Sequence, residues 1–408
     1  MSTIIYLLPP AHGHVNPTLP VIQELVTRGE TIICYNTAEF RVQIEQTGAH
    51  FRAYPPMEMT PVALSRLLQD GNLARITGLI LRTTEHLLPF LLDAFAHEKP
   101  DLIVFDSIAL WGKMAATILG VHAVASISHF VMDEHQLPFL DIVRLLGQVL
   151  PQMPAILFAR RRLMNTYGTA YPSARPLFPM RGDLNIVFTS QELQPSIPLI
   201  DATFRFVGPA INPQTRSGTS MADELGQEKV IYISLGTIHT PQSSFVRTCF
   251  AAFADYPTRV IMSVGSQVAS SAIGSIPANF IVRPSVPQLD VLQQTAVFIT
   301  HGGMNSIHEG LYYGVPLILI PHQVEQLLNA RIVTARGAGY LLTHQLTHTQ
   351  ITVPILRQAV DTVMADPHYR VAAQSLQGSL RATGGYYQAA DAIQSYISES
   401  RMIVVTPV

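Results

Sequence analysis

Short apolar runs alternate with amphipathic stretches along the first part of the chain. The runs at 4–9, 31–36 and 50–55 (IIYLLP, TIICYN and HFRAYP) have the length and composition of buried strands. The stretches at 19–29 and 38–48 between them have the apolar spacing of helices. This order predicts an α/β fold with parallel strands and helices on both faces of a doubly wound sheet.

The alternation occurs twice, which indicates two domains. DLIVFD and HAVASIS continue the first series, and a second begins at VIYISLG. Within the first series, the proline-containing stretch 133–181 breaks the rhythm before LNIVFTS and FRFVGPA close it, and we expect helices and loops there that wall a pocket. We predict a first domain at 1–210, a linker at 211–229, a second domain at 230–385 and a C-terminal segment at 386–408.

Composition describes a well-buried globular protein, with 48% hydrophobic and 13% charged residues in a chain of 408. The formal net charge of −2 gives no electrostatic support for a nucleic-acid partner. No uncharged apolar run reaches the ~18 residues of a spanning helix, and the N-terminus lacks the features of a signal peptide. Cys34 and Cys249 have neither disulfide nor zinc spacing. We therefore expect a cytoplasmic protein without membrane or nucleic-acid partners. We also expect a monomer, although the oligomeric state is not readable from these features.

The segment HGGMNSIHEGLYYGVPLILIPHQVEQ, residues 301–326, carries the strongest chemical signal. It follows the apolar run AVFIT, and its two glycines permit a tight turn before Asn305 and Ser306 open a helix. The unpaired amides and positive dipole end of such a helix suit a pyrophosphate, with the His301 imidazole and the Ser306 hydroxyl as further donors.

Polar side chains beyond this helix start complete a nucleotide-sugar site. Glu309 lies one turn further on and would accept both hydroxyls of a ribose. Glu325 and Gln326 follow the next apolar strand and would hold the hydroxyls of a sugar. Each residue alone is more often structural, but their combined order favours nucleotide-sugar binding.

His14 and Asp106 follow two strands of the first series, and ligands of doubly wound sheets bind beyond the carboxyl ends of strands. Pro17 is a favourable first helical residue, so we expect His14 in the loop above the sheet. Transfer of a sugar to a hydroxyl needs a base near neutral pH, and an imidazole held by a carboxylate supplies one. His14 would take the proton, Asp106 would orient its ring, and His12 would shape the loop.

These motifs resemble those of the UDP-glycosyltransferase family of plants and bacteria, including bacterial macrolide and flavonoid glycosyltransferases. The resemblance extends from PAHGHVNPTLP, through KPDLIVFD and the 301–326 segment, to GGYYQAADAI near the end. It implies a GT-B fold: two facing Rossmann-like domains with a cleft between them, and a C-terminal helix that crosses back to the first domain. It also implies an inverting transfer of a hexose, expected to be glucose, from a UDP-sugar to a hydroxyl of a small hydrophobic acceptor such as a flavonoid, phenolic or macrolide. No tightly bound cofactor and no metal are required in that scheme.

The resemblance assigns roles to residues at the strand ends. It makes His14 and Asp106 the catalytic pair, and it places uracil and ribose contacts at the Val286 backbone and the Gln288 side chain. The residues expected to bind the donor are Gly13, Ser234, Gly236, Thr237, Ser266, Val286, Gln288, His301, Gly303, Asn305, Ser306, Glu309, Glu325 and Gln326.

One departure concerns the nucleobase. Ser285 stands where many family members carry a tryptophan that stacks on uracil, so base binding is either weaker or supplied by Arg283 lying over the ring. The cluster of His129, Asp133, Glu134 and His135 suggests a metal site at first sight, but we expect His129 to line the acceptor pocket instead.

Two alternatives stay open at this point. A UDP-sugar epimerase of similar two-domain build would need no aglycone, and the PAHGH motif argues against it. A noncatalytic nucleotide-sugar-binding protein would be expected to lack the base or its carboxylate, and both are present. A shift in the geometry of His14 and Asp106 would nevertheless leave a site that binds without catalysis.

Overall fold

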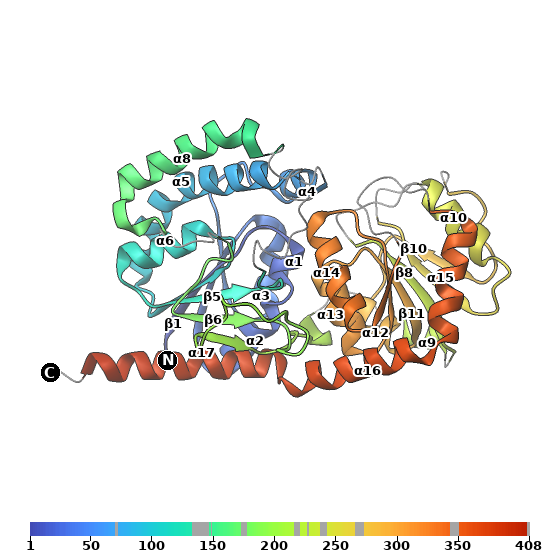
Figure 1. The fold of residues 1–408 in the computed structure, drawn as a ribbon. Helices are drawn as coiled ribbons and strands as arrows, with labels where there is room; N and C mark the ends of the chain where they lie inside the picture. The colour runs from blue at the N-terminus through green and yellow to red at the C-terminus, as the bar shows by residue number, and fades with distance from the viewer. Residues whose placement is uncertain are drawn as a thin grey trace. The chain divides into compact units, whose positions relative to one another are not determined.

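The computed structural model describes residues 1–69, 72–132, 147, 149–172, 178–215, 221–226, 228–236, 243–265, 273–342 and 351–405. The chain divides into two compact units (Figure 1). Unit 1 is Met1–Ile211 together with Thr383–Val408, and unit 2 is Asn212–Ala382. Each unit contains its own parallel sheet with helices against it, which confirms the doubly wound α/β fold expected from the alternation.

The sheet of unit 1 has the strand order β3-β2-β1-β4-β5-β6-β7, and each neighbouring pair is parallel. Its strands are β1 Thr3–Leu7, β2 Thr31–Asn36, β3 His50–Ala53, β4 Leu102–Asp106, β5 Ala123–Ile127, β6 Leu184–Val187 and β7 Phe204–Phe206. Its helices are α1 His12–Val15, α2 Leu19–Thr27, α3 Arg41–Gln46, α4 Pro61–Gln69, α5 Leu73–Glu98, α6 Leu110–Leu119, α8 Met153–Tyr167 and α17 Gly385–Val405.

Strand β1 shows why both faces of this sheet are buried. Successive side chains of a strand point to opposite faces, so Ile5 and Leu7 belong to one apolar core and Ile4 and Tyr6 to the other. Helices α5, α6 and α8 supply the first core, and α2, α3 and α17 supply the second. The continuous apolar runs of the sequence are therefore strands covered on both sides.

Helix α17 belongs to unit 1 although it comes last in the chain, and it lies along α2 (Figure 1). Ala389, Ala390 and Ile393 are almost completely buried in the core that α2 lines. At its polar edge, Arg28 donates to Asp391 at 2.5 Å and to Gln394 at 3.1 Å. The expected return of the C-terminal helix to the first domain is confirmed.

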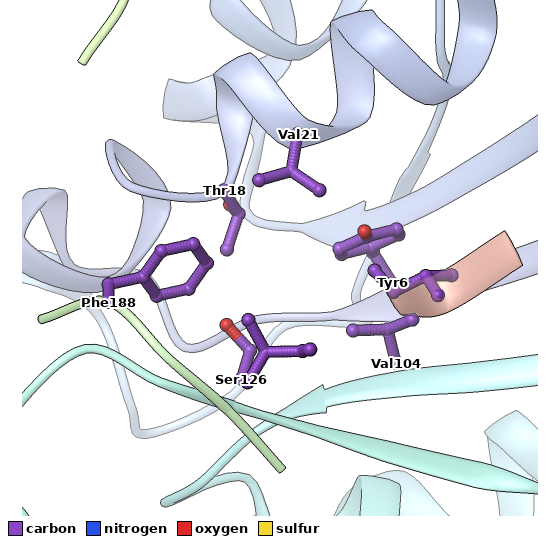
Figure 2. Close-up of a pocket in the computed structure, with 8 residues that line it drawn as sticks. Tyr6, Thr18, Val21, Val104, Ser126 and Phe188 are labelled. Atoms are coloured by element: carbon purple, nitrogen blue, oxygen red, sulfur yellow. The ribbon is translucent and has the colours of Figure 1, made fainter. Parts of the chain in front are cut away.

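A cavity of about 10 Å³ lies in the second core of unit 1 (Figure 2). It is lined by Tyr6, Thr18, Val21, Val104, Ser126, Ile186, Phe188 and Ile393. Thr18 donates its hydroxyl to the carbonyl of Val15 at 2.8 Å. The hydroxyls of Tyr6 and Ser126 are buried, and neither finds a hydrogen-bond partner among the described residues. This is an imperfection in an otherwise close-packed core.

Unit 2 repeats the architecture with the strand order β10-β9-β8-β11-β12-β13, again parallel throughout. Its strands are β8 Val230–Ser234, β9 Arg259–Ser263, β10 Phe280–Arg283, β11 Thr295–Thr300, β12 Leu317–Leu319 and β13 Gly339–Leu341. Its helices are α9 Ala222–Leu225, α10 Ser243–Phe253, α12 Gln288–Gln293, α13 Met304–Tyr312, α14 Val324–Ala335, α15 Val353–Ala365 and α16 Pro367–Ala382. One face of the sheet is covered by α10 and α15.

None of the helices in the described part of the chain combines the length and apolar character needed to cross a bilayer.

Candidate functional site

The strand order of unit 1 reverses direction between β1 and β4, and crevices at such switch points are where doubly wound sheets bind ligands. His14 comes after β1, and Asp106 is the last residue of β4. Parallel strands end at the same edge of a sheet, so the topology places both residues at this edge. The sequence identified both positions but not their contact.

His14 and Asp106 are joined by a short hydrogen bond, with Nδ1 2.8 Å from Oδ2. Asp106 is fully buried, whereas the His14 side chain is 22% exposed. The second carboxylate oxygen of Asp106 accepts the backbone N–H of Ile108 at 3.0 Å, which fixes the rotation of the carboxylate. A carboxylate can only accept, so Nδ1 carries the proton and Nε2 carries the lone pair. The pair is thus arranged as a base whose ring is held by a buried carboxylate.

His14 lies in the short helix α1 and not in a loop, because the chain turns helical directly after Ala11. The expectation based on Pro17 was wrong in this detail, since α2 begins only at Leu19. Gly13 is exposed in the same turn, with open space where a side chain would be. His12 packs its ring edge against Phe40 with centroids 4.9 Å apart, in keeping with a structural role.

Ser128 is a neighbour of the pair that the sequence did not single out. Its hydroxyl lies 3.2 Å from His14 Nδ1, just beyond the end of β5. The signal was available in principle, because β5 follows β4 along the chain and pairs with it at Asp106 and Ser126. A polar residue at the carboxyl end of the neighbouring strand is therefore a candidate on topology alone.

His129 forms a separate hydrogen-bond network beside this pair. Its Nδ1 donates a hydrogen bond to the carbonyl of Phe130 at 2.9 Å. In the neutral ring Nε2 then accepts a hydrogen bond from the hydroxyl of Ser107 at 3.0 Å. The other members of the suggested metal cluster lie outside the described residues. Among the residues that are described, no group of three or more His, Cys, Asp or Glu side chains is placed to hold a metal ion.

In unit 2 the switch point falls between β8 and β11, and predicted donor-binding residues follow both strands. Gly236 follows β8 with φ of 82°, and His301 follows β11. A β-carbon added at Gly236 would lie 2.5 Å from the His301 ring, and one added at Gly303 would lie 2.4 Å from its Nε2. A side chain at either position would displace the His301 ring, and the two glycine backbones lie against this largely buried imidazole.

The helix start proposed as the phosphate site is present, one residue earlier than expected. Helix α13 begins at Met304 with Gly303 as its N-cap, so Asn305 and Ser306 lie in the first turn. Asn329 of α14 was missed by the sequence reasoning: it is fully buried, and its side-chain amide donates to the Gly302 carbonyl at 3.2 Å. This bond ties the glycine turn to the following helix.

Glu309 and Gln288 are brought into direct contact, which spacing alone did not show. Gln288, the first residue of α12, donates from Nε2 to Glu309 Oε2 at 2.6 Å. Tyr232 of β8 in turn donates its hydroxyl to Gln288 Oε1 at 3.0 Å. The ribose-binding candidates are therefore one hydrogen-bonded group.

The remaining donor candidates are more dispersed. Ser234 is buried at the end of β8, and Val286 is half-buried. In α14, Glu325 is exposed, whereas Gln326 is buried and accepts the backbone N–H of His322 at 2.9 Å. Thr237 and Ser266 lie outside the described residues.

Arg283 is already engaged, and Ser285 beside it is exposed. The guanidinium of Arg283 reaches both carboxylate oxygens of Glu224, at 2.8 and 2.9 Å. The idea that Arg283 replaces the missing aromatic contact to the base would require it to give up this pair.

Comparisons with known proteins bear on the family and the fold of the chain. The sequence profile of the UDP-glucoronosyl and UDP-glucosyl transferase family matches residues 201–379. The NDP-glycosyltransferase YjiC of Bacillus licheniformis is 33% identical over 394 residues, which cover 95% of this chain and 96% of that protein. The chain belongs to the UDP-glycosyltransferase family. It is a glycosyltransferase of the GT-B fold.

Two further similarities span nearly the whole chain. The uncharacterized UDP-glucosyltransferase YojK of Bacillus subtilis is 29% identical over 402 residues, covering 98% of each protein. The crystal structure of the glycotransferase of kitacinnamycin superposes with a TM-score of 0.81 at 29% identity, covering 97% of this chain and 98% of that one. The likeness thus includes both units and not only residues 201–379.

Proposed function

We propose that this glycosyltransferase moves a hexose, glucose in the simplest case, from a UDP-sugar to a hydroxyl of a small hydrophobic acceptor such as a flavonoid, phenolic or macrolide, with inversion at the anomeric carbon. Unit 1 activates the acceptor and unit 2 binds the donor. The observation that carries the proposal is the 2.8 Å bond between His14 and the fully buried Asp106. A noncatalytic binder would have no use for such a pair.

The chemistry is a single displacement. The acceptor hydroxyl loses its proton to His14 Nε2 while its oxygen attacks the anomeric carbon, and the bond from that carbon to the UDP oxygen breaks with its electron pair leaving on UDP. Attack opposite to the leaving group inverts the configuration. Asp106 stabilises the imidazolium that forms, as the carboxylate does in a hydrolase triad, but no protein nucleophile takes part.

Unit 2 would bind the donor through groups that favour an anion. The amides at the start of α13, the Ser306 hydroxyl and the His301 imidazole would meet the charge that develops on the leaving diphosphate. Glu309 and Gln288 would take the ribose, and Glu325 and Gln326 the sugar hydroxyls. With the charge met by these groups, we expect turnover without added metal.

The choice of substrates rests on the relatives. The name of YojK supports glucose, and the family description names UDP-sugars. The glycotransferase of kitacinnamycin supports a small natural-product acceptor.

Both cysteines are buried and unbonded, which fits a reducing compartment such as the cytoplasm.

The test is release of UDP from UDP-glucose by the purified protein, in the presence of EDTA, with and without a panel of flavonoid, phenolic and macrolide acceptors. We expect release that depends on an acceptor and that His14→Ala abolishes. The product should carry the sugar in the inverted configuration, which NMR of the anomeric proton establishes. Tight UDP binding without release for any acceptor would favour the noncatalytic nucleotide-sugar binder. Acceptor-independent conversion of the sugar would favour an epimerase.

A further inference from the structure

A directional chain of hydrogen bonds runs through unit 2 from strand β8 through helix α12 to helix α13. Tyr232 donates to Gln288 Oε1 at 3.0 Å, and Gln288 Nε2 donates to Glu309 Oε2 at 2.6 Å. Tyr232 is the one member of this chain that the donor-site prediction did not contain.

The direction of each bond follows from chemistry. An ionised carboxylate only accepts, so Gln288 must turn its NH₂ group toward Glu309 and its carbonyl oxygen toward Tyr232. The tyrosine hydroxyl must then donate to that oxygen. Burial raises the pKa of Tyr232 above its ordinary value, so the hydroxyl keeps its proton in neutral solution.

Tyr232 is itself held rigidly. Its side chain is 1% exposed, and its ring stacks on Phe298 of the neighbouring strand β11 with centroids 4.7 Å apart and planes at 15°. By contrast, Gln288 is half-buried at the start of α12, and its side chain has several rotatable bonds. A fixed donor at Tyr232 removes the freedom of the Gln288 amide to flip or to swing away from Glu309.

We propose that Tyr232 is a positioning residue of the donor site: its hydroxyl fixes the Gln288 amide, which in turn orients the Glu309 carboxylate toward the ribose of the bound nucleotide. The ribose contact itself rests on the proposed function. A correctly aimed carboxylate distinguishes a ribose from a deoxyribose, so Tyr232 contributes to selection of ribonucleotide donors.

The test uses Tyr232→Phe in the full-length chain, since this change keeps the stacked ring and removes only the hydroxyl. Calorimetric titration with UDP and with 2′-deoxy-UDP measures both affinity and discrimination. We expect the affinity for UDP to fall about 5- to 10-fold, the scale of one lost hydrogen bond, and the preference for UDP over 2′-deoxy-UDP to shrink. The double variant Tyr232→Phe/Gln288→Met should bind UDP about as weakly as Gln288→Met alone. Both changes act through the same amide, so their effects should not add.

Tyr256→Phe is the matched control. It also removes a tyrosine hydroxyl from unit 2, one that donates to Asp361 at 2.7 Å and takes no part in the chain. We expect UDP affinity to be unchanged in this variant. A loss equal to that of Tyr232→Phe would show a general effect of destabilising unit 2 and would overturn the positioning role.

Crystal structures of the ligand-free protein and of Tyr232→Phe separate this inference from the proposed function. The proposal requires the Gln288 amide to leave Glu309 in the variant, and an amide that stays in place with unchanged UDP affinity overturns it. If the unaltered protein binds no UDP and yet the amide moves in Tyr232→Phe, the donor assignment fails while the positioning role stands.

Discussion

The contact between His14 and Asp106 joins residues 92 positions apart in the chain. Each residue was identifiable from its place after a strand, but their distance is a consequence of β1 and β4 being neighbours in the sheet. Asp106 is fully buried and held by the N–H of Ile108, so its carboxylate has one orientation available for the imidazole. In the proposed reaction the base would thus be oriented before substrate binds.

Replacing Asp106 with Asn tests this orientation. An amide NH₂ facing Nδ1 would favour the histidine tautomer with its proton on Nε2, which removes the lone pair that accepts the acceptor's proton. We expect kcat to fall roughly 10²- to 10⁴-fold with UDP affinity unchanged. Ser128→Ala is the comparison, since Ser128 touches the same nitrogen at 3.2 Å without fixing the tautomer, and its effect should be much smaller. Equal losses in both variants would contradict the role given to Asp106.

Gly303→Ala tests the close approach at the donor loop. The added β-carbon would lie 2.4 Å from His301 Nε2, so the imidazole must move from its position between the two glycine backbones. We expect UDP affinity to fall by about 10-fold or more. Gly378→Ala in α16 is the control, because nothing lies within 4 Å of its added β-carbon and alanine favours a helix. That variant should bind UDP normally and unfold at the same or a higher temperature.

At the scale of elements, the sequence predicted the strands well because continuous apolar runs are typical of parallel strands covered on both faces. It was less accurate where helices begin. Helix α13 starts at Met304, one residue before the polar pair that was expected to open it, and His14 lies in a helical turn that local propensity did not indicate. Such boundaries are set by backbone hydrogen bonds of the folded chain, in which Val15 bonds back to Ala11.

Tyr6→Phe tests the buried cavity between β1, α2 and α17. The hydroxyl of Tyr6 has no partner among the described residues. A buried polar group without a hydrogen bond lowers the free energy of unfolding by about 1–3 kcal/mol. We expect Tyr6→Phe to unfold at the same or a higher temperature. Tyr35→Phe is the matched control in the adjacent strand β2, since it removes a hydroxyl that donates to Glu98 at 2.8 Å, and it should lower the melting temperature. Equal destabilisation of both would mean that a buried water bonds the Tyr6 hydroxyl.

At the scale of the whole molecule, the proposed chemistry is divided between two units that each have their own sheet and core. The pair proposed to activate the acceptor belongs to unit 1. The residues proposed to bind the donor belong to unit 2, apart from Gly13 in unit 1. The two activities should therefore respond separately to mutation.

His14→Ala and Glu309→Ala test this division. His14→Ala should remove nearly all turnover and leave UDP affinity close to unchanged, because the base touches only the acceptor. Glu309→Ala should weaken UDP binding about 10-fold or more, since a charged hydrogen-bond partner of the ribose is lost. Calorimetry with UDP and turnover assays on both variants measure the two effects. A large loss of UDP affinity in His14→Ala would contradict the assignment.

The sequence by itself determined the two doubly wound sheets and the family, and it supplied the candidate site positions. Apolar periodicity is local, and residues that follow strands are recognisable from the chain alone. Only the tertiary structure decided which of these residues touch. Such contacts depend on strand order, register and side-chain direction. They include the hydrogen bonds from His14 to Asp106 and from Gln288 to Glu309, and the contacts of Ser128, Tyr232 and Asn329. Tyr232 shows what local sequence cannot reveal. It lies inside the apolar run of β8, where nothing in the neighbouring sequence distinguishes it from a core residue. Its hydroxyl gains the proposed role only when β8 is folded beside α12 and α13.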